Sequence, residues 1–335
     1  MVAFGVSPRE SVLIVLAVLV QGIAGGYLWL LISRDRDCGA LDLVGMGVVL
    51  GSALAVVSGI LIRPLMDSAL NPLAPAAILF LVFVIRSWRL PWRRRSVNSW
   101  DWVFAGPALG GLLAGLAILV VNLRRYPLYW TGIWDQYHPD MVFFEALSRS
   151  AARYGSSDSV FMVGADIRYH WFSYAWAGQI TELVGAQPFV VLTRALPIVA
   201  LIATLAIALA WTRKLVVSAD MELPHFTKAL PWLVVALIVT GGYLGALNGT
   251  ILNFDSPSQA LGTAWLMGLI LVFLRIVRAA GRKDSGLVLS GQILVLGLLT
   301  GVVAGAKVSS GALFVVAIGF VAVMGSLVRA KWANI

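Results

Sequence analysis

Charged residues are scarce in this chain. Only 12% of its 335 residues are Asp, Glu, Lys or Arg, whereas 60% are hydrophobic. Soluble domains carry a charged fraction of about 25%. The composition therefore excludes an ordinary soluble enzyme and predicts a membrane protein, because each spanning helix needs about 20 predominantly apolar residues. The first apolar run continues past signal-peptide length without a small-residue cleavage site, so we expect it to be retained as a span.

Cysteine is almost absent, and so are the motifs of soluble enzymes. The single Cys38 excludes an internal disulfide and a cysteine-based metal centre. The sequence has no phosphate-binding glycine loop, no pair of histidines spaced to hold a metal on one helix, and no nucleophilic serine elbow. Any chemistry is therefore expected in the loops between the spans.

Nine apolar stretches are predicted to span the membrane. The positive-inside rule places the basic segment 86–95 in the cytoplasm, and the loops then alternate with the N-terminus outside and the C-terminus inside. The cytoplasmic side receives 16 of the 25 basic residues and seven of the 16 acidic ones, which accounts for the whole net charge of +9. The excess positive charge thus indicates membrane topology rather than nucleic-acid binding. The predicted spans are 11–32, 42–62, 71–86, 103–123, 189–211, 230–248, 260–276, 287–306 and 311–328.

A further apolar stretch, residues 171–186, is predicted not to span. As a helix it would reach about 24 Å, which is short of the hydrocarbon core of about 30 Å. Its Gln179, Thr181 and Glu182 are poor lipid-facing residues. The stretch is therefore interpreted as a juxtamembrane or re-entrant helix.

The predicted fold class is an all-α polytopic membrane protein. It has about nine transmembrane helices, the juxtamembrane or re-entrant helix, and a large first external loop with amphipathic helices at residues 124–188. We divide it into residues 1–100, with the N-terminal spans and the basic cytoplasmic loop, and a transmembrane core at residues 101–335. The first three spans are interpreted as an addition to that core.

The external loop contains a predicted amphipathic helix that begins at Asp140 and stops at Gly155. Glu145 stands four residues before Arg149, which allows an ion pair. We expect this helix to lie on the membrane with a carboxylate at its start. Its apolar residues recur at helical spacing and form one face, namely Met141, Phe144, Leu147 and Ala151.

Acidic residues and histidines gather at two external places that are far apart in the sequence. A carboxylate can take a proton from a hydroxyl, and carboxylates with a divalent cation can hold a phosphate leaving group. Simpler roles are also open: Asp140 can cap a helix, Asp255 can start a turn, and Glu145 can pair with Arg149. The first place holds Asp135, His138, Asp140 and Glu145, and the second is Asp255 in the loop 248–259.

Three basic groups are candidate phosphate contacts. In the segment 166–170 an extended backbone would put Asp166, Arg168 and His170 on one face. Arg168 can bind phosphate in a forked geometry or pair with Asp166. Lys307, the only lysine on the predicted outer side, can grip a lipid phosphate or act as a boundary residue that extends to the interface. His138 and His170 are candidates for ligands or for hydrogen-bond donors.

The order of these features resembles the GT-C superfamily of integral-membrane glycosyltransferases. A span is followed by a long external loop with an Asp and a helix, then by the junction RYHWFSYAW (168–176), then by the span LTRALPIVALIATLAIALAW (192–211). The resemblance covers about residues 102–328. Relatives of this kind continue beyond the point where this chain stops, so we expect a chain that is truncated by comparison, with a membrane protein partner.

The resemblance implies a transfer of sugar from a polyprenyl-phosphate donor to an acceptor hydroxyl of a glycan or lipid, in synthesis of the cell-envelope glycan. It assigns Asp140, with Asp135 as the alternative, as catalytic base. It assigns Asp255 to the donor phosphate or to a divalent cation (Mg²⁺ or Mn²⁺), for which His138 is a further candidate ligand. Arg168, Lys307 and His170 would contact the donor phosphate, and Glu145 and Asp166 complete the candidate site.

Two other functions remain open at this point. A transporter or flippase of lipid-linked glycans would place ionisable groups near the middle of its spans and show internal repeats. The predicted spans have no acidic residue in their middle, and no repeat is apparent. A non-catalytic assembly subunit would suit the early end of the chain. The expected location is the bacterial plasma membrane, with membrane lipids as surroundings and no nucleic-acid partner.

Overall fold

The computed structural model describes most of the chain. Between Met1 and Val316 the regular elements in the described part are helices, and no strand occurs among them. The described residues are 1–33, 38–87, 99–124, 126–128, 140–154, 164–165, 170–218, 224–241, 256–281, 286–307, 311–312 and 314–316. The predicted all-α class is thereby confirmed for this part of the chain.

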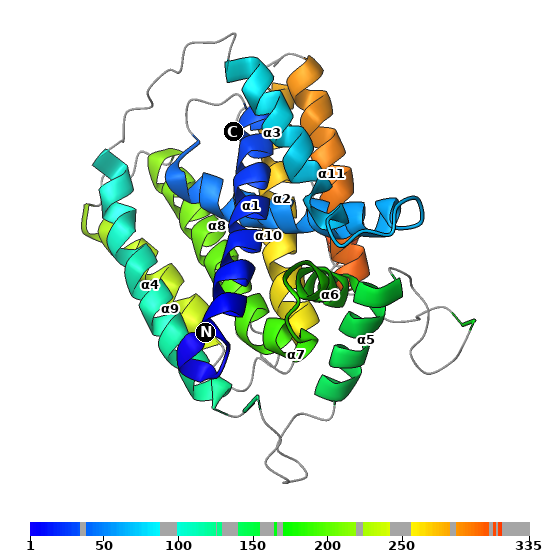
Figure 1. Cartoon of the computed structure of the whole chain (residues 1–335). Helices are drawn as coiled ribbons and strands as arrows, with labels where there is room; N and C mark the ends of the chain where they lie inside the picture. Colours follow the sequence, from blue (N-terminus) through cyan, green and yellow to red (C-terminus); the bar gives the residue numbers. More distant parts are fainter. Residues whose placement is uncertain are drawn as a thin grey trace.

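Eleven α-helices are labelled along the described chain (Figure 1), together with three short turns of other helix types. The turns are the 3₁₀ turns η1 (Val2–Phe4) and η2 (Asn71–Leu73) and the π-helical turn η3 (Val191–Ala195). The α-helices are α1 (Pro8–Ser33), α2 (Ala40–Ile62), α3 (Ala74–Ser87), α4 (Ser99–Leu123), α5 (Asp140–Tyr154), α6 (Phe172–Val184), α7 (Pro188–Val190), α8 (Leu196–Ser218), α9 (Pro224–Gly241), α10 (Pro257–Gly281) and α11 (Gly286–Ala306).

Six of the described helical segments are long and apolar enough to cross a membrane, so this is a membrane-embedded protein. The predicted spans 71–86 and 230–248 correspond to shorter apolar helices, Asn71–Arg86 and Lys228–Val239. The ninth predicted span, 311–328, lies mostly outside the described residues, so the count of nine stays a prediction. The six segments are Pro8–Ser33, Ala40–Ile62, Val103–Val120, Pro188–Val216, Pro257–Val277 and Leu289–Ala306.

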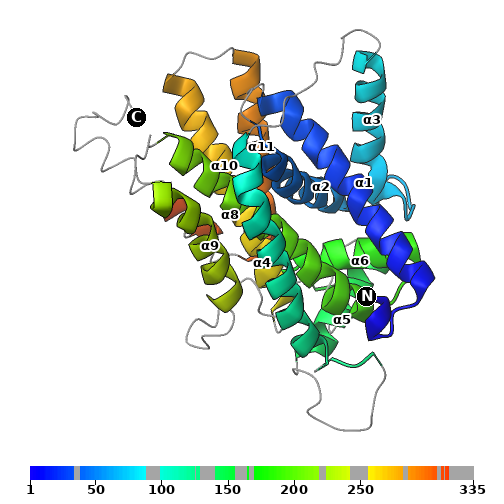
Figure 2. The same cartoon turned by 90° about the vertical axis from the view of Figure 1, so that its left-hand side faces the viewer.

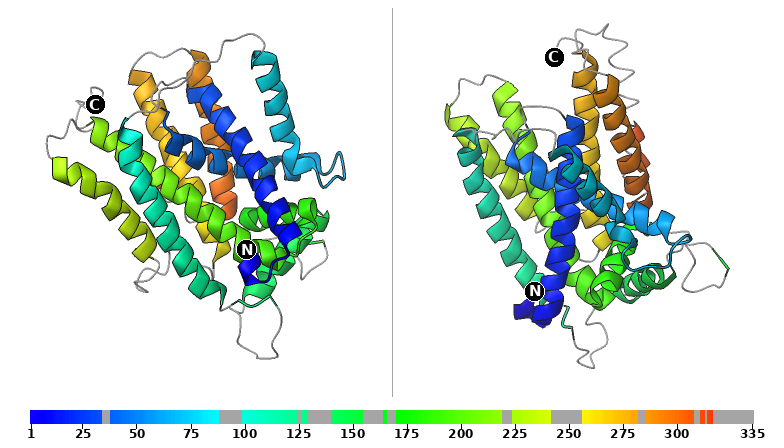
Figure 3. Two further views of the ribbon diagram at one scale, coloured as in Figure 1. Left: turned by 60° about the vertical axis from the view of Figure 1, so that its left-hand side comes forward. Right: turned by 45° about the horizontal axis from the view of Figure 1, so that its top comes forward.

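While α2 runs across the bundle, most of the other long helices end on two opposite faces (Figures 1 and 2). One of them, at the bottom of Figure 1, carries the start of α1, the end of α4, helices α5, α6 and α7, and the start of α10. We call it the loop face. The oblique views place α5 and α6 against the same end of the bundle (Figure 3). Both helices belong to the predicted external loop and its junction.

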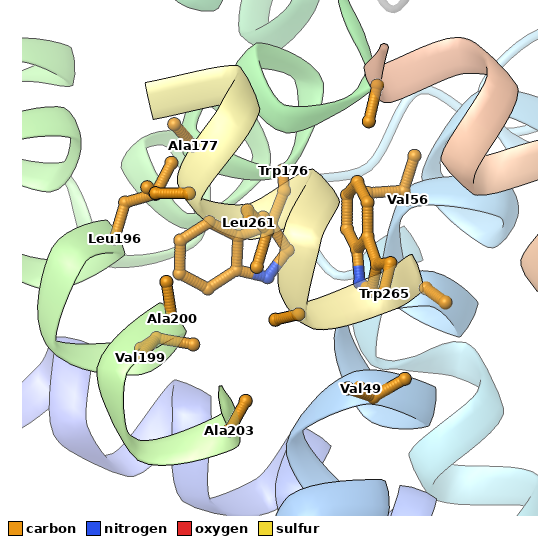
Figure 4. Close-up of a cluster of buried hydrophobic side chains, with 14 of the residues drawn as sticks. Val49, Val56, Trp176, Ala177, Leu196, Val199, Ala200, Ala203, Leu261 and Trp265 are labelled. Atoms are coloured by element: carbon orange, nitrogen blue, oxygen red, sulfur yellow. The ribbon is translucent and has the colours of Figure 1, made fainter. Parts of the chain in front are cut away.

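The core joins the N-terminal helices to the rest of the chain. Val56 of α2 lies beside the indole ring of Trp265 from α10, and Trp176 from α6 lies beside Leu196 and Ala200 of α8 (Figure 4). All five residues are completely buried. The Trp265 indole N–H donates to the hydroxyl of Ser52, with a donor–acceptor distance of 2.9 Å. One hydrophobic core therefore includes residues from both sides of the boundary expected at residue 100.

Helices α1 and α2 approach so closely that glycine is required at their contact. A Cβ at Gly25 would lie 2.2 Å from the Gly47 carbonyl oxygen, and one at Gly51 would lie 2.0 Å from that of Gln21. Small residues allow such backbone contact, which supplies van der Waals attraction where lipid provides no hydrophobic driving force. The contact brings Gln21 within reach of α6, where the Trp176 indole N–H donates to its side-chain oxygen at 3.1 Å.

Candidate functional site

Helix α6 is short and embedded in protein. Its 13 residues reach about 20 Å, too short to cross the core, as the sequence predicted. Two polar residues of this stretch bind protein groups: the buried Gln179 amide donates to the Val56 carbonyl at 3.3 Å, and Glu182 pairs with Arg63. These contacts explain how a helix with polar side chains sits beside apolar spans.

Helix α5 has the predicted bounds and packs its apolar face on α6. Met141, Phe144 and Leu147 are buried, which confirms the predicted face. The Phe144 ring stacks on Tyr174 of α6, with 4.7 Å between the ring centroids. The expectation that this face rests on lipid is therefore corrected, because a protein surface covers it. The sequence shows the apolar periodicity but not the partner that covers the face.

The first residue of α5 is Asp140, and its side chain is exposed. It thus presents a carboxylate on the loop face, at the position predicted for the catalytic base. Glu145, one turn later, lies 3.6 Å from the guanidinium of Arg149, whose side chain is 67% exposed. The structure therefore shows the ion pair that the sequence allowed for Glu145. An exposed pair of this kind contributes little to stability.

Two of the predicted phosphate contacts, His170 and Lys307, come together on the loop face. His170 lies two residues before α6, and Lys307 directly follows α11. The Lys307 ammonium group donates to the side-chain oxygen of Gln259, at the start of α10, over 2.7 Å. Its charge also acts on the imidazole of His170. Three distant segments therefore contribute to one polar group of side chains, which we call the Lys307 cluster: His170, Gln259 and Lys307.

A second contact holds the same segments together. The hydroxyl of Ser173, in the first turn of α6, donates to the Ser258 carbonyl at 3.4 Å. Gly305 of α11 also lies against the Phe172 ring, where a Cβ would approach the ring atoms to 2.6 Å. The start of α6, the start of α10 and the end of α11 are thus packed around the Lys307 cluster.

Partial burial sets the ionisation of this cluster. Burial lowers the pKa of His170 below its ordinary value, and the positive charge of Lys307 lowers it further. Burial also lowers the pKa of Lys307. A depressed pKa means that the charged form has lost water that the protein does not fully replace. A negatively charged ligand beside the cluster would stabilise the charged forms of both groups and oppose both shifts.

Replacing Lys307 by glutamine is expected to raise the pKa of His170. The substitution removes the repulsive charge while burial still opposes protonation, so the pKa moves up but does not exceed the ordinary value of about 6.5. A pH titration of histidine-labelled protein by NMR measures the shift. Lys228→Gln is the matched control, since Lys228 is an exposed lysine on α9. An unchanged His170 pKa in Lys307→Gln would show that the two groups do not interact.

Five predicted site residues fall outside the described part of the chain, and their roles stay predictions. They include both candidate metal ligands. Among the residues that the structure describes, no three side chains from His, Cys, Asp and Glu are grouped closely enough to hold a metal ion. The five are Asp135, His138, Asp166, Arg168 and Asp255.

Gln259 and Arg194 are polar residues of this region that sequence analysis did not single out. The buried guanidinium of Arg194 donates to the Tyr126 carbonyl at 2.6 Å and to the Thr193 hydroxyl at 2.9 Å. It therefore ties the exit of α4 to the start of α8. Arg194 lies in the π-helical turn η3, a local widening that is frequent at functional sites. The signal that the sequence offers for it is an arginine within the predicted span 189–211.

A buried ionic group on the opposite face was also missed. Asp42 in the first turn of α2 is 1% exposed and pairs with Lys214 of α8. The guanidinium of Arg275, from α10, lies 3.7 Å from the same carboxylate and stacks over the Trp29 ring at 4.5 Å. Asp42, Lys214 and Arg275 each lie near the end of a predicted span, and the sequence analysis used them only in the count of charges on the cytoplasmic side. Pairing between distant span ends has no signature in a single sequence.

Comparisons of the chain with protein-family models, with curated proteins and with solved structures find no match. The class of protein is therefore defined by the fold and the site themselves. It is an all-α membrane-embedded protein with a partly buried cationic cluster and an exposed carboxylate on its loop face.

Proposed function

We propose that this chain is a membrane glycosyltransferase of the GT-C type. It would move a sugar from a polyprenyl-phosphate donor to an acceptor hydroxyl of a glycan or lipid. One observation carries the proposal: the partly desolvated Lys307, held by Gln259 beside His170, lies on the same face as the exposed carboxylate that begins α5. That face would provide both an anion site and a proton acceptor.

In the proposed reaction the Asp140 carboxylate, or that of Asp135, takes the proton of the acceptor hydroxyl. The hydroxyl oxygen then attacks the anomeric carbon with inversion. The bond from that carbon to the phosphate oxygen breaks, and polyprenyl phosphate leaves with the electron pair. Lys307 and Arg168 balance the charge on the leaving phosphate. In the superfamily that the sequence resembles, a divalent cation would do the same, and Asp255 and His138 are its predicted ligands.

The proposed orientation puts the loop face on the outside of a bacterial plasma membrane. The N-terminus would then lie outside and the C-terminus in the cytoplasm, which follows the distribution of basic residues. A donor with a long lipid tail can reach a site at this level from within the bilayer. Labelling with an impermeant thiol reagent tests the orientation, using cysteines introduced at positions 140 and 307 in a Cys38→Ser background.

Lys307→Gln is expected to raise the KM for the lipid-phosphate donor by about tenfold to a hundredfold, the range for loss of a charge-assisted hydrogen bond. The kcat should fall less, because the interaction is present in the bound donor as well as in the transition state. The measurement is incorporation of labelled sugar from the lipid donor at varied donor concentration. Lys228→Gln serves as the control. An unaltered KM in Lys307→Gln would contradict the assigned phosphate contact.

The same assay separates the proposal from the two alternatives. A transporter or flippase would move lipid-linked glycan across vesicle membranes without transferring sugar. Because the parent would then show no sugar transfer, Lys307→Gln and Asp140→Asn could not lower it. An assembly subunit would show no transfer alone and would alter that of a partner. The buried ion pairs of Asp42 lie at the ends of α2, α8 and α10 rather than in mid-span, which is unlike the midplane sites of transporters.

A further inference from the structure

One arginine joins three elements on the loop-face side of the bundle. Arg63 stands immediately after α2, and its guanidinium reaches the end of α5 as well as α6. One nitrogen contacts both the Ala152 carbonyl and the Glu182 carboxylate. The other nitrogen donates to the Arg153 carbonyl at 2.7 Å. The side chain of Arg63 is only 13% exposed. Its contacts with Ala152 and Glu182 are partly buried, and that with Arg153 lies at the surface.

The two carbonyls belong to the last turn of α5, which ends at Tyr154. Carbonyls in that position lack partners within the helix and carry the negative end of its dipole. A guanidinium satisfies both with its two-pronged donor geometry, which an ammonium cannot reproduce. Arg63 therefore caps α5 from another helix, and its bond to Glu182 fixes it against α6 at the same time.

A small hollow beside Arg63 is polar, but it is too small for a substrate. Arg63, Asn71, Gln179 and Glu182 contribute to its lining, and its free space holds about one water molecule. The side-chain oxygen of Gln179 is buried there without a hydrogen-bond partner, while its amide nitrogen is bound to Val56. The hollow therefore belongs to a polar joint between helices, in which one water would complete the hydrogen bonds.

The rest of α5 is held by its apolar face near the middle of the helix. There a Cβ at Gly178 of α6 would lie 2.1 Å from the Ser148 carbonyl oxygen, so the two backbones touch. From Ser148 the helix extends about 12 Å to Asp140 and about 6 Å to Ala152. A shift of the Ala152 end about this contact would thus move the Asp140 end about twice as far. A misplacement of about 1 Å can cost about a hundredfold in rate.

We propose that Arg63 is a positioning residue that fixes the orientation of α5 on the membrane bundle. Helix α6 is embedded in the core through Trp176 and does not depend on this contact. Helix α5 contributes only one face, with Met141, Phe144 and Leu147, to this core, and Arg63 holds its last turn. The joint therefore sets where the other end of α5 presents the Asp140 carboxylate. Only the consequence for sugar transfer rests on the proposed function.

The test is a thiol-accessibility measurement on the full chain in membranes. Ala152 is buried, with 7% exposure, at the end of α5 that Arg63 holds. In a Cys38→Ser background, Ala152→Cys should react slowly with a thiol reagent. Adding Arg63→Gln should accelerate the reaction by about tenfold to a hundredfold, as expected for the loss of charge-assisted hydrogen bonds. A cysteine placed by Thr204→Cys, in the buried centre of α8, reports on the bundle itself.

Two further variants make the result specific to the forked contacts. Arg63→Lys keeps the charge but reaches fewer of the partners, so its acceleration should fall between those of the parent and Arg63→Gln. Asp67→Asn removes only an exposed partner of Arg63, 3.0 Å from the guanidinium and 85% exposed, and should leave the rate unchanged. If the thiol at 152 reacts equally fast with and without Arg63, the proposal is wrong.

A rise at both 152 and 204 would also contradict the proposal, because Arg63 would then hold the whole bundle rather than α5. Accessibility needs no substrate, so this result stands apart from the question of sugar transfer. If the chain transfers sugar, kcat should fall in the order parent, Arg63→Lys, Arg63→Gln, with less change in the donor KM. If Arg63→Gln accelerates labelling at position 152 but the parent transfers no sugar, the positioning role of Arg63 is supported and the proposed glycosyltransferase function is rejected.

Discussion

Asp140→Asn is expected to lower the kcat of sugar transfer by about a hundredfold to ten-thousandfold, the usual contribution of a positioned general base. Asparagine has nearly the same shape and also serves at helix starts, so α5 should keep its place. It cannot accept the proton of the acceptor hydroxyl. The loss would therefore measure proton transfer rather than the capping role that Asp140 can also fulfil.

The measurement compares three substitutions of the same kind in the external loop. Asp135→Asn tests the alternative base directly, since only one of the two carboxylates is expected to take the proton. Glu145→Gln is the matched control on α5: its exposed pair with Arg149 should change the rate by no more than a few-fold. Full activity in both Asp140→Asn and Asp135→Asn would remove the proposed base and with it the mechanism.

Asp42→Asn is expected to destabilise the bundle by about 3–5 kcal/mol, the cost of leaving buried partner charges uncompensated. The Asp42 carboxylate faces Lys214 and Arg275, so its neutralisation leaves two cations without their shared counter-ion. The substitution retains an acceptor for the Gly39 N–H, which Asp42 binds at 3.2 Å. The effect is thus electrostatic and separate from the start of α2.

The loss is measured as a lower midpoint of denaturant-induced unfolding in detergent micelles. A variant that combines Asp42→Leu, Lys214→Met and Arg275→Met provides the control, because removing a whole buried ionic group costs much less than removing one partner. This triple variant should recover most of the stability lost in Asp42→Asn. Equal stability of Asp42→Asn and the parent would mean that the two cations do not rely on the carboxylate.

Helix α5 illustrates how far local sequence could predict this fold. Its start at Asp140, its end before Gly155 and its apolar face at Met141 and Phe144 follow from spacing within 15 residues. The sequence did not predict that α6 covers this apolar face, because lipid and a neighbouring helix can cover an apolar face equally well. Only Gly178, small enough for backbone contact, allows α6 to take that place.

The candidate site shows the same limit at longer range. Lys307 and His170 were chosen from the sequence for their charge and their expected side of the membrane. The Lys307 cluster forms only because the starts of α6 and α10 lie against the end of α11, which brings Gln259 to Lys307. Such tertiary contacts are made by residues far apart in the chain, and a single sequence contains no periodic signal that predicts them.

The sequence by itself determined that this is a helical membrane protein, because the hydrocarbon core demands long apolar segments and internal backbone hydrogen bonding. It also predicted the approximate positions of the described long helices and the chemical types available in the loops. The tertiary structure alone decided which distant polar groups meet: Asp42 with Lys214, Arg63 with the end of α5, and Lys307 with Gln259. A polar side chain in apolar surroundings must find a partner, but packing decides which partner lies within reach.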